Sequence, residues 1–261
     1  MSGAGRVLAG LGADLAAGFG LLTHFPVGWL VRPGQPYRPG RAIWCYPLAG
    51  AAIGALVGTG LVGARSIGFG PGLAAAWALC AALLLTGGLH EDGLADLADG
   101  CGGGHTPEQR LEIMRDSRIG AFGALALGIC LLIRFGAMSA LASRPGPETI
   151  GILAAACALS RMAMLPVLRL PPARADGLGR SLGTPTCPVL AGMVLTATLI
   201  AVATLPLRLV PGALVVSVVV GWGISRFAVS RLGGRTGDVL GACVMAAECV
   251  LLSLATVLPP A

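Results

Sequence analysis

Long apolar runs that contain no charged side chain recur along this chain. They lie at 42–64, 66–88, 119–133, 181–207, 209–225 and 249–261. Since a helix needs about 20 apolar residues to cross a bilayer, these runs predict seven membrane helices, near 43–64, 71–89, 121–142, 150–168, 189–207, 212–230 and 239–258. The expected fold is therefore all-α, a polytopic membrane helical bundle that forms a single domain over residues 1–261.

The N-terminal segment 7–31 is also apolar, but its pattern is broken by Asp14, His24 and Pro26. We expect it to form an interfacial or re-entrant helix beside the bundle. Within the first predicted span, Gly50, Gly54 and Gly58 recur every four residues, a spacing that suits close helix packing in lipid.

Composition supports a protein of the lipid bilayer. The chain is 55% hydrophobic and 11% charged, with a mean hydropathy of +0.83, whereas soluble domains carry about 25% charged residues. The net charge of +6 comes from arginine, because the chain has no lysine. No arginine-rich tract with interleaved aromatics is present, so nucleic acid is not an expected partner. The eight cysteines are scattered without a Cys-x-x-Cys motif, which argues against a disulfide framework or a zinc site.

The arginines divide unequally when the chain alternates sides through seven spans from an inner N-terminus. The outer loops hold Arg65, Arg144 and Arg208 alone. The inner side holds Arg6, Arg32, Arg38, Arg41, Arg110, Arg115, Arg118, Arg169, Arg174, Arg180, Arg226, Arg231 and Arg235. Because cytoplasmic loops are enriched in arginine, this bias places the acid-rich and glycine-rich loops in the cytoplasm.

The stretch "GGLHEDGLADLADG", from Gly87 to Gly100, concentrates negative charge in this otherwise apolar chain. Asp92, Asp96 and Asp99 stand at i, i+4 and i+7, which places them on one stripe of a helix. Like charges so placed repel, and a divalent cation removes that penalty. Hard oxygen ligands in small number suit Mg²⁺. The alternative is a solvated acidic face at the membrane edge, and the preceding His90 and Glu91 are either supporting groups or ordinary interfacial residues.

A short cytoplasmic helix is expected next, over about 107–117. Thr106 and Gln109 form a capping box around Pro107, which fits the first helical position. At the far end of this helix, Asp116 and Arg118 border the next span, so we expect them to contact metal and phosphate. Beyond them, Gly120 and Gly123 would let a ligand approach the backbone closely.

Charged residues deep inside spans form a second group. Glu248 lies ten residues beyond Asp238, or about 15 Å along a helix, and a carboxylate at that depth is functional by default. Arg161 lies at a similar depth in its own span, so we expect it to pair with Glu248 or to face the same polar cavity. Arg134 has no obvious partner and is expected to extend toward the outer face.

One membrane surface is thus expected to carry an acidic stripe for Mg²⁺, several arginines and glycine-rich loops. This combination favours phosphoryl or phosphodiester transfer. The blocks "GGLHEDGLADLADG", "RLEIMRDSRIGAFGALAL" and "GGRTGDVLGACVMAAE", with "SR" inside a span and "GLG" at 177–179, resemble the cobalamin synthase family, the adenosylcobinamide-GDP ribazoletransferases. The resemblance covers nearly the whole chain. It departs at "LLTHFPV", where His24 stands in place of an expected arginine.

The resemblance implies a multi-pass enzyme of the bacterial inner membrane. It would join adenosylcobinamide-GDP to α-ribazole or its 5′-phosphate in a Mg²⁺-dependent reaction, giving adenosylcobalamin or its phosphate, and GMP. On this hypothesis Asp92, Asp96 and Asp99 hold the metal, and one of them or Glu91 takes a proton from the ribazole 3′-hydroxyl. The residues expected at the diphosphate or elsewhere on the substrates are Arg118, Arg161, Arg235, Asp116, Asp238, Glu248 and His90.

Two alternatives come from other classes. CDP-alcohol phosphotransferases also use a helical aspartate set, but their Asp-Gly-x-x-Ala-Arg motif lacks its arginine here, since Asp92-Gly93 is followed by Leu94-Ala95-Asp96. A transporter should carry mid-membrane charges on several helices, whereas most acids here lie in one loop. The sequence leaves open whether the chain forms a homo-oligomer.

Overall fold

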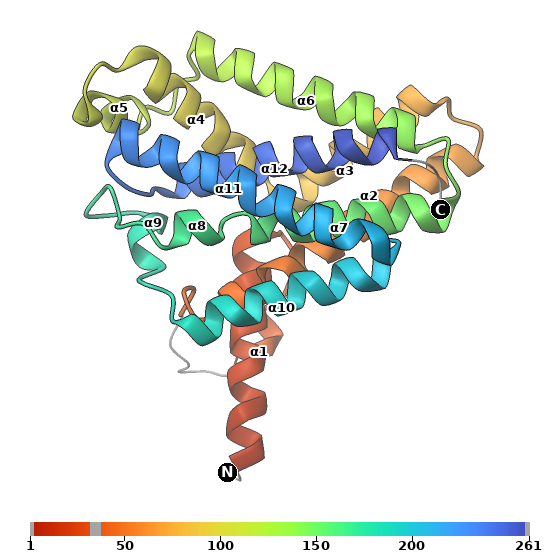
Figure 1. Cartoon of the computed structure of the whole chain (residues 1–261), viewed down its shortest axis with the longest axis horizontal. Helices are drawn as coiled ribbons and strands as arrows, with labels where there is room; N and C mark the ends of the chain where they lie inside the picture. The colour runs from red at the N-terminus through yellow and green to blue at the C-terminus, as the bar shows by residue number, and fades with distance from the viewer. Residues whose placement is uncertain (1–2, 32–37, 259–261) are drawn as a thin grey trace.

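The computed structural model describes residues 3–31 and 38–258, without the side chains of residues 3–8. Arg32 and the side chain of Arg6, both assigned above to the inner side, lie outside the described residues. Figure 1 shows helices throughout, and the one β-type pairing in the described chain is an isolated bridge between Pro172 and Arg235. The longer helices are α1 (Gly3–Leu22), α2 (Tyr46–Ser66), α3 (Pro71–Thr86), α4 (Leu89–Gly103), α6 (Ala121–Leu141), α7 (Gly146–Met162), α10 (Cys187–Thr204), α11 (Val210–Leu232) and α12 (Gly237–Val257).

Six helical segments of the described chain are long and apolar enough to cross a membrane. They are Ala42–Ser66, Ala121–Leu141, Gly146–Leu168, Cys187–Thr204, Leu207–Leu232 and Gly237–Val257. The third includes the short α8 (Leu165–Leu168), and the six correspond to six of the seven predicted spans. The all-α membrane bundle is therefore confirmed in its class.

The predicted span near 71–89 corresponds to α3, which meets the next helix at a sharp bend. α3 ends at Thr86, and α4 leaves at 89° to it. Gly87 and Gly88 both have positive φ, at 65° and 69°, a conformation that costs glycine little but other residues more. The two glycines thus stop α3 and turn the acidic segment into a separate helix. The bent pair α3–α4 makes a seventh span only if it is counted as one.

The most extensive helix contact in the described chain lies between α2 and α7, and glycines allow the two backbones to approach closely. A β-carbon at Gly50, Gly54 or Gly58 would overlap the α7 backbone around residues Ile150, Leu153 and Cys157. The predicted role of these glycines in close packing is confirmed.

Helix α1 runs across the direction of the spans in Figure 1, as an interfacial helix would. Asp14 does not interrupt it, because its Oδ2 accepts hydrogen bonds from Arg41 Nε at 3.1 Å and Trp44 Nε1 at 3.2 Å. The acid therefore ties α1 to the start of α2 rather than facing lipid.

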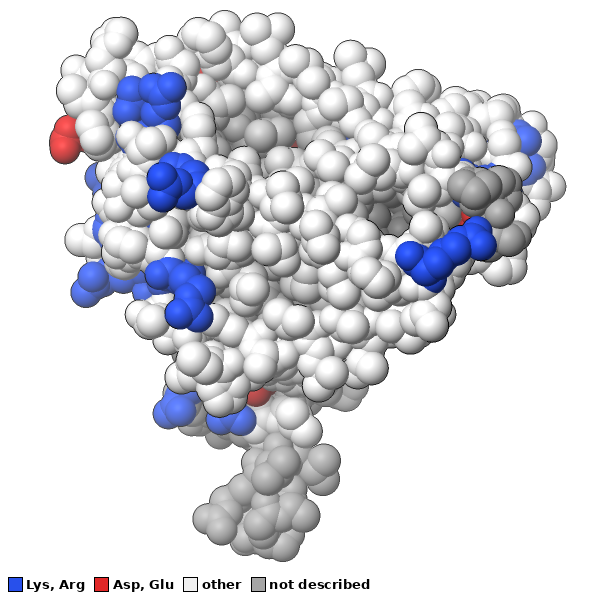
Figure 2. Space-filling view, viewed as in Figure 1, with Lys and Arg blue, Asp and Glu red and all other residues white. Residues whose placement is uncertain are grey.

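Charged and apolar side chains occupy different parts of the surface. Figure 2 shows coloured surface at the two ends of the long axis and beside α1, with a white band between them. Exposed apolar side chains such as Leu125, Leu132, Leu195, Val219 and Trp222 belong to α6, α10 and α11. A band of this kind is what lipid contact requires.

The arginines assigned to outer loops gather at one end of the bundle. Arg144 and Arg208 line one cavity there, and Arg65 Nε donates to the carbonyl of Ala142 beside them.

Candidate active site

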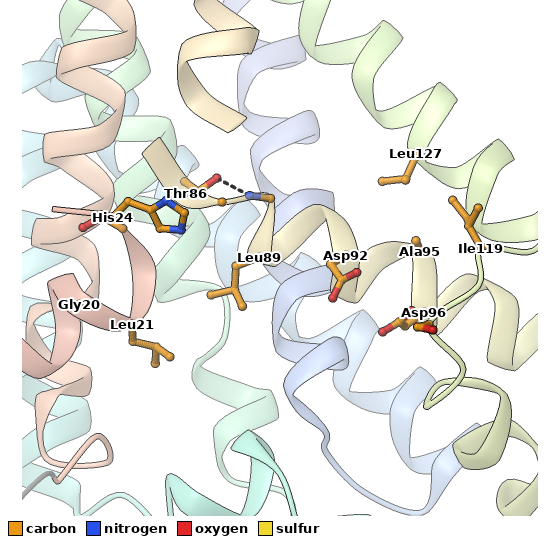
Figure 3. A pocket seen from close by; sticks show the side chains of 14 residues that line it. Gly20, Leu21, His24, Thr86, Leu89, Asp92, Ala95, Asp96, Ile119 and Leu127 are labelled. Carbon is orange, nitrogen blue, oxygen red and sulfur yellow. Dashed lines mark hydrogen bonds between the residues drawn. The ribbon is translucent and has the colours of Figure 1, made fainter. Parts of the chain in front are cut away.

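A wide cavity lies between the end of α1, the Gly87–Gly88 bend, α4 and the start of α6. Its volume is about 620 Å³, and it is lined by Gly20, Leu21, Thr23, His24, Thr86, Gly87, Gly88, Leu89, Asp92, Ala95, Asp96, Ser117, Ile119 and Leu127. We call it the large cavity. Figure 3 shows Asp92 and Asp96 on the same side of α4, with His24 at the opposite end of the cavity. The 89° bend therefore brings two of the predicted metal ligands to a chamber large enough for a substrate.

Asp96 lies near two other acids, Asp92 and Asp238. Burial, together with the charges of Asp92 and Asp238, raises the pKa of Asp96 to about 6. α4 lies outside the six spans, so this carboxyl is in a polar region at the bundle's flank. Repulsion between neighbouring acids is the condition that a bound cation relieves.

Asp99, the third member of the predicted stripe, binds protein instead. Its two carboxylate oxygens accept hydrogen bonds from the backbone N–H groups of Gly120 at 2.7 Å and Gly123 at 2.8 Å, at the N-terminus of α6. A β-carbon at either glycine would overlap this carboxylate. The group that approaches these glycines is therefore the chain's own Asp99, not the ligand predicted from the sequence.

Asp238 supplies the third acid near the pair. Gly93 of α4 packs against the backbone of Asp238 at the start of α12, where an added β-carbon would lie 2.9 Å from Asp238 Cα. Arg174 Nη2 lies 3.5 Å from Asp238 Oδ2, and the charges of both residues act on Asp96. From the sequence, Arg174 was expected only to lie on the inner side of the membrane. Its position in the loop 169–188, which contains arginine and glycine, was the one sequence feature that pointed to a role at the site. The sequence does not show which loop contacts α4.

Asp116 and Arg118 lie at the rim of the large cavity, since Ser117 and Ile119 line it. The two side chains form an exposed ion pair, with Arg118 Nη2 2.6 Å from Asp116 Oδ2. This arginine lowers the pKa of Asp116 to about 2. Their predicted contacts with phosphate and metal stay predictions, since such contacts require the pair to separate.

The deep charges form one buried network. Arg161 Nη1 lies 3.1 Å from Glu248 Oε2, which confirms the predicted pairing. Arg134 Nη2 lies 2.9 Å from Glu248 Oε1, and Arg134 Nη1 lies 2.7 Å from Glu91 Oε1. The expectation that Arg134 reaches toward the outer face is wrong: this side chain is 3% exposed, because two carboxylates compensate its charge inside the bundle.

Glu91 and His90 lie in the interior as well. Glu91 lines neither the large cavity nor the adjoining smaller one, whereas His90, 3% exposed, lines the smaller one. The geometry therefore favours Asp92 over Glu91 as the group that meets a substrate hydroxyl.

Arg235 is a structural residue in the described chain. Its guanidinium, in a residue that is 2% exposed, donates to four backbone carbonyls, those of Leu168, Leu170, Gly179 and Gly183. These bonds hold the loop 169–183 against the start of α12. Because four of its five N–H groups are used in this way, the predicted role of Arg235 in gripping diphosphate or GMP gains no support from the structure and stays a prediction.

The donor set suits a cation that keeps most of its water. Among the described residues no group of three or more His, Cys, Asp or Glu side chains stands ready to enclose a metal ion. Mg²⁺ in nucleotide enzymes is commonly held by one or two carboxylates together with substrate phosphates, and Asp92 and Asp96, one helical turn apart, offer that set.

Comparison with known proteins identifies the family. A family model described as "CobS: Cobalamin-5-phosphate synthase" matches residues 14–256. A protein of Bradyrhizobium diazoefficiens named adenosylcobinamide-GDP ribazoletransferase is 41% identical over 248 residues, 93% of each chain. Proteins of the same name from Azorhizobium caulinodans and Rhizobium johnstonii are 41% and 38% identical, covering 95% and 91% of this chain and 95% of each relative. No solved structure matches. By the extent of these matches, the chain belongs to the cobalamin-5-phosphate synthase family.

Proposed function

We propose that this chain transfers the cobinamide phosphate of adenosylcobinamide-GDP to α-ribazole or its 5′-phosphate, releasing GMP. The products are adenosylcobalamin or its 5′-phosphate, in the step that assembles the nucleotide loop. The relatives' names support the reaction. The single structural observation that carries it is the pair Asp92 and Asp96, one turn apart on α4, in a cavity of about 620 Å³.

The same pair supports a requirement for Mg²⁺. Burial and then the neighbouring charge of Asp92 raise the pKa of Asp96, and two hard oxygen donors one turn apart fit this ion. When bound, it would neutralise charge on the diphosphate oxygens. Asp92 and Asp96 are the residues that would hold it.

The chain's own groups then have assignable tasks. The 3′-hydroxyl oxygen of the ribazole attacks the phosphorus nearest cobinamide, the bond from that phosphorus to the bridging oxygen breaks, and GMP leaves with the bridging oxygen. Asp92 accepts the hydroxyl proton, since it lies on the cavity wall. Arg174, beside Asp238, is placed to attract the anionic diphosphate.

We place the protein in the bacterial inner membrane with the large cavity toward the cytoplasm. The arginine-rich loops lie at the α4 end of the bundle, and arginine-rich loops face inward. Nucleotide-activated substrates are made on that side. Labelling of single cysteines introduced at Asp176 and Arg208, at opposite ends, would test the orientation: only the former should be protected from an impermeant reagent in intact cells.

The test of the function is GMP release from adenosylcobinamide-GDP by the purified protein in lipid, with and without α-ribazole. Asp92→Asn and Asp96→Asn should each lower turnover by about 10² or more, since removing one electrostatic group from a phosphoryl-transfer site costs that much. The matched control is Asp176→Asn, an exposed acid that pairs with Arg115 and should leave turnover unchanged. Absence of GMP release by the unaltered protein would refute the proposal, and uptake of cobinamide into vesicles without GMP release would indicate a transporter.

A further inference from the structure

A second cavity lies on the other side of Asp92, and it is smaller and more apolar than the first. Its volume is about 140 Å³. Its apolar wall includes Leu21, Leu22, Tyr46, Met164, Leu182 and Leu240, and its polar groups are His90, Asp92 and Asp238. We call it the small cavity. Four separate parts of the chain build it: the end of α1, the start of α2, α4 and the segment from Met164 to Gly241.

Asp92 belongs to both cavities, as do Leu21 and Leu89. The two chambers are thus adjacent, and one carboxylate stands on their common wall. In-line transfer of a phosphoryl group requires the attacking and leaving oxygens on opposite sides of the phosphorus. Two chambers that meet at one carboxylate provide that arrangement.

Two buried polar atoms of residues that line the small cavity make no hydrogen bond within the described chain. Among the described residues His90 Nδ1 and Asp238 Oδ2 make no hydrogen bond, although both atoms are buried, and Asp238 Oδ2 has only Arg174 at 3.5 Å. Buried polar groups without a partner reduce stability. A ligand that offers hydroxyl groups at this end of the cavity would remove that cost.

Size separates the ligands that the two cavities can take. At roughly 30 Å³ of liquid volume per water molecule, the small cavity has room for about five waters, whereas the large one is more than four times bigger. A corrin or a dinucleotide cannot enter the small cavity. A planar heterocyclic base fits both its volume and its leucine, methionine and tyrosine walls.

From this geometry we infer that the small cavity is the acceptor subsite, which holds the heteroaromatic base of a nucleoside among Met164, Leu182 and Leu240 and directs its sugar hydroxyl toward Asp92. The large cavity then takes the diphosphate donor. This inference rests on the proposed function and adds which chamber receives which substrate. No new bond chemistry is involved beyond the transfer described above.

Two glycines line the small cavity where α4 and α12 meet, Gly93 and Gly241. An added β-carbon at Gly241 would lie 3.2 Å from His90 Cα. The close approach of the two helices at this wall therefore depends on the absence of side chains at these positions.

The test compares substitutions of equal size in two different cavities. Leu240→Phe reduces the volume of the small cavity. Leu209→Phe makes the same change in a cavity of about 280 Å³ at the other end of the bundle. In GMP-release assays, Leu240→Phe should raise the KM for α-ribazole about tenfold or more, with the KM for adenosylcobinamide-GDP within twofold. Leu209→Phe should change neither constant.

A second variant keeps the inference testable if Leu240→Phe fails to fold. Met164→Ala enlarges the small cavity, so kcat/KM for an acceptor with one more fused ring in its base should rise about tenfold relative to α-ribazole. A rise in donor KM for either variant, with acceptor KM unchanged, would overturn the assignment of the subsite. Failure of the unaltered protein to release GMP refutes the proposed function instead, so the two failures are distinguishable.

Discussion

The buried network of Glu91, Arg134, Glu248 and Arg161 offers the sharpest test of what stabilises this bundle. It contains two arginines and two glutamates, so it is neutral as a unit. Arg134 connects α4 and α12 through Glu91 at 2.7 Å and Glu248 at 2.9 Å. Arg134→Met keeps an unbranched apolar chain and removes the guanidinium charge, which leaves the interior with one excess negative charge.

The expected cost follows from that imbalance. Removing one partner of a buried ion pair destabilises by about 3–5 kcal/mol, since the remaining charge stays unpaired. At about 2–4 °C per kcal/mol for a chain of this size, the lower figure corresponds to a midpoint about 6–12 °C lower. Glu91→Gln should destabilise for the same reason, with an excess positive charge.

The double variant Arg134→Met with Glu91→Gln restores neutrality. Glu248 retains Arg161 at 3.1 Å, so the combined loss should be smaller than the sum of the two single losses by about 1–3 kcal/mol. The thermal midpoint is measured in detergent for the unaltered protein, the two single variants and the double variant. Each midpoint is taken from the GMP release that the protein retains after heating. Additive losses would refute the argument that charge balance, rather than side-chain packing, sets the cost.

Three other outcomes are expected. Asp99→Ala removes the acceptor for the N–H groups of Gly120 and Gly123. It should therefore lower the free energy of unfolding by about 1–2 kcal/mol in the same thermal assay. Loss of Mg²⁺ affinity with unchanged stability would contradict the structural role of Asp99. Arg235→Met leaves four backbone carbonyls without their donor and should lower the free energy of unfolding by roughly 3 kcal/mol. The KM for adenosylcobinamide-GDP, measured at low temperature, should stay within twofold. A large rise in that KM would instead indicate that Arg235 binds the substrate. Chelation of divalent cations should abolish GMP release and added Mg²⁺ should restore it, with Asp92→Asn needing about tenfold more Mg²⁺; turnover that persists under chelation would exclude the metal.

The features that the sequence predicted well depend only on the order of residues along the chain. Charge-free windows located five of the six spans, and apolar character despite Arg161 located the sixth, Gly146–Leu168. The capping box of Thr106 and Gln109 is formed as expected at α5 (Pro107–Ile113). The pairing of Arg161 with Glu248 was also predictable. Both charges lie deep in their spans, and lipid leaves a deep charge few alternatives to an opposite one.

The features that it missed depend on angles between helices. A stripe of Asp92, Asp96 and Asp99 is a correct statement about α4, yet the neighbouring helices assign different tasks to its members. α6 meets the stripe at Asp99 with its free N–H groups, so that carboxylate caps a helix. The first two acids face the large cavity instead.

The 89° bend at Gly87–Gly88 is the element that converts a membrane span into a site. If α3 continued straight through residues 87–103, four acids would follow it along the bundle axis and would need four cationic partners in lipid. Because the chain turns, only Glu91 enters the interior, where Arg134 compensates it, and Asp92 and Asp96 reach a cavity. The "GG" pair was visible in the sequence, but two adjacent glycines are common in this chain of 41 glycines. What distinguishes this pair is the positive φ of both residues, which only the arrangement of the neighbouring helices requires.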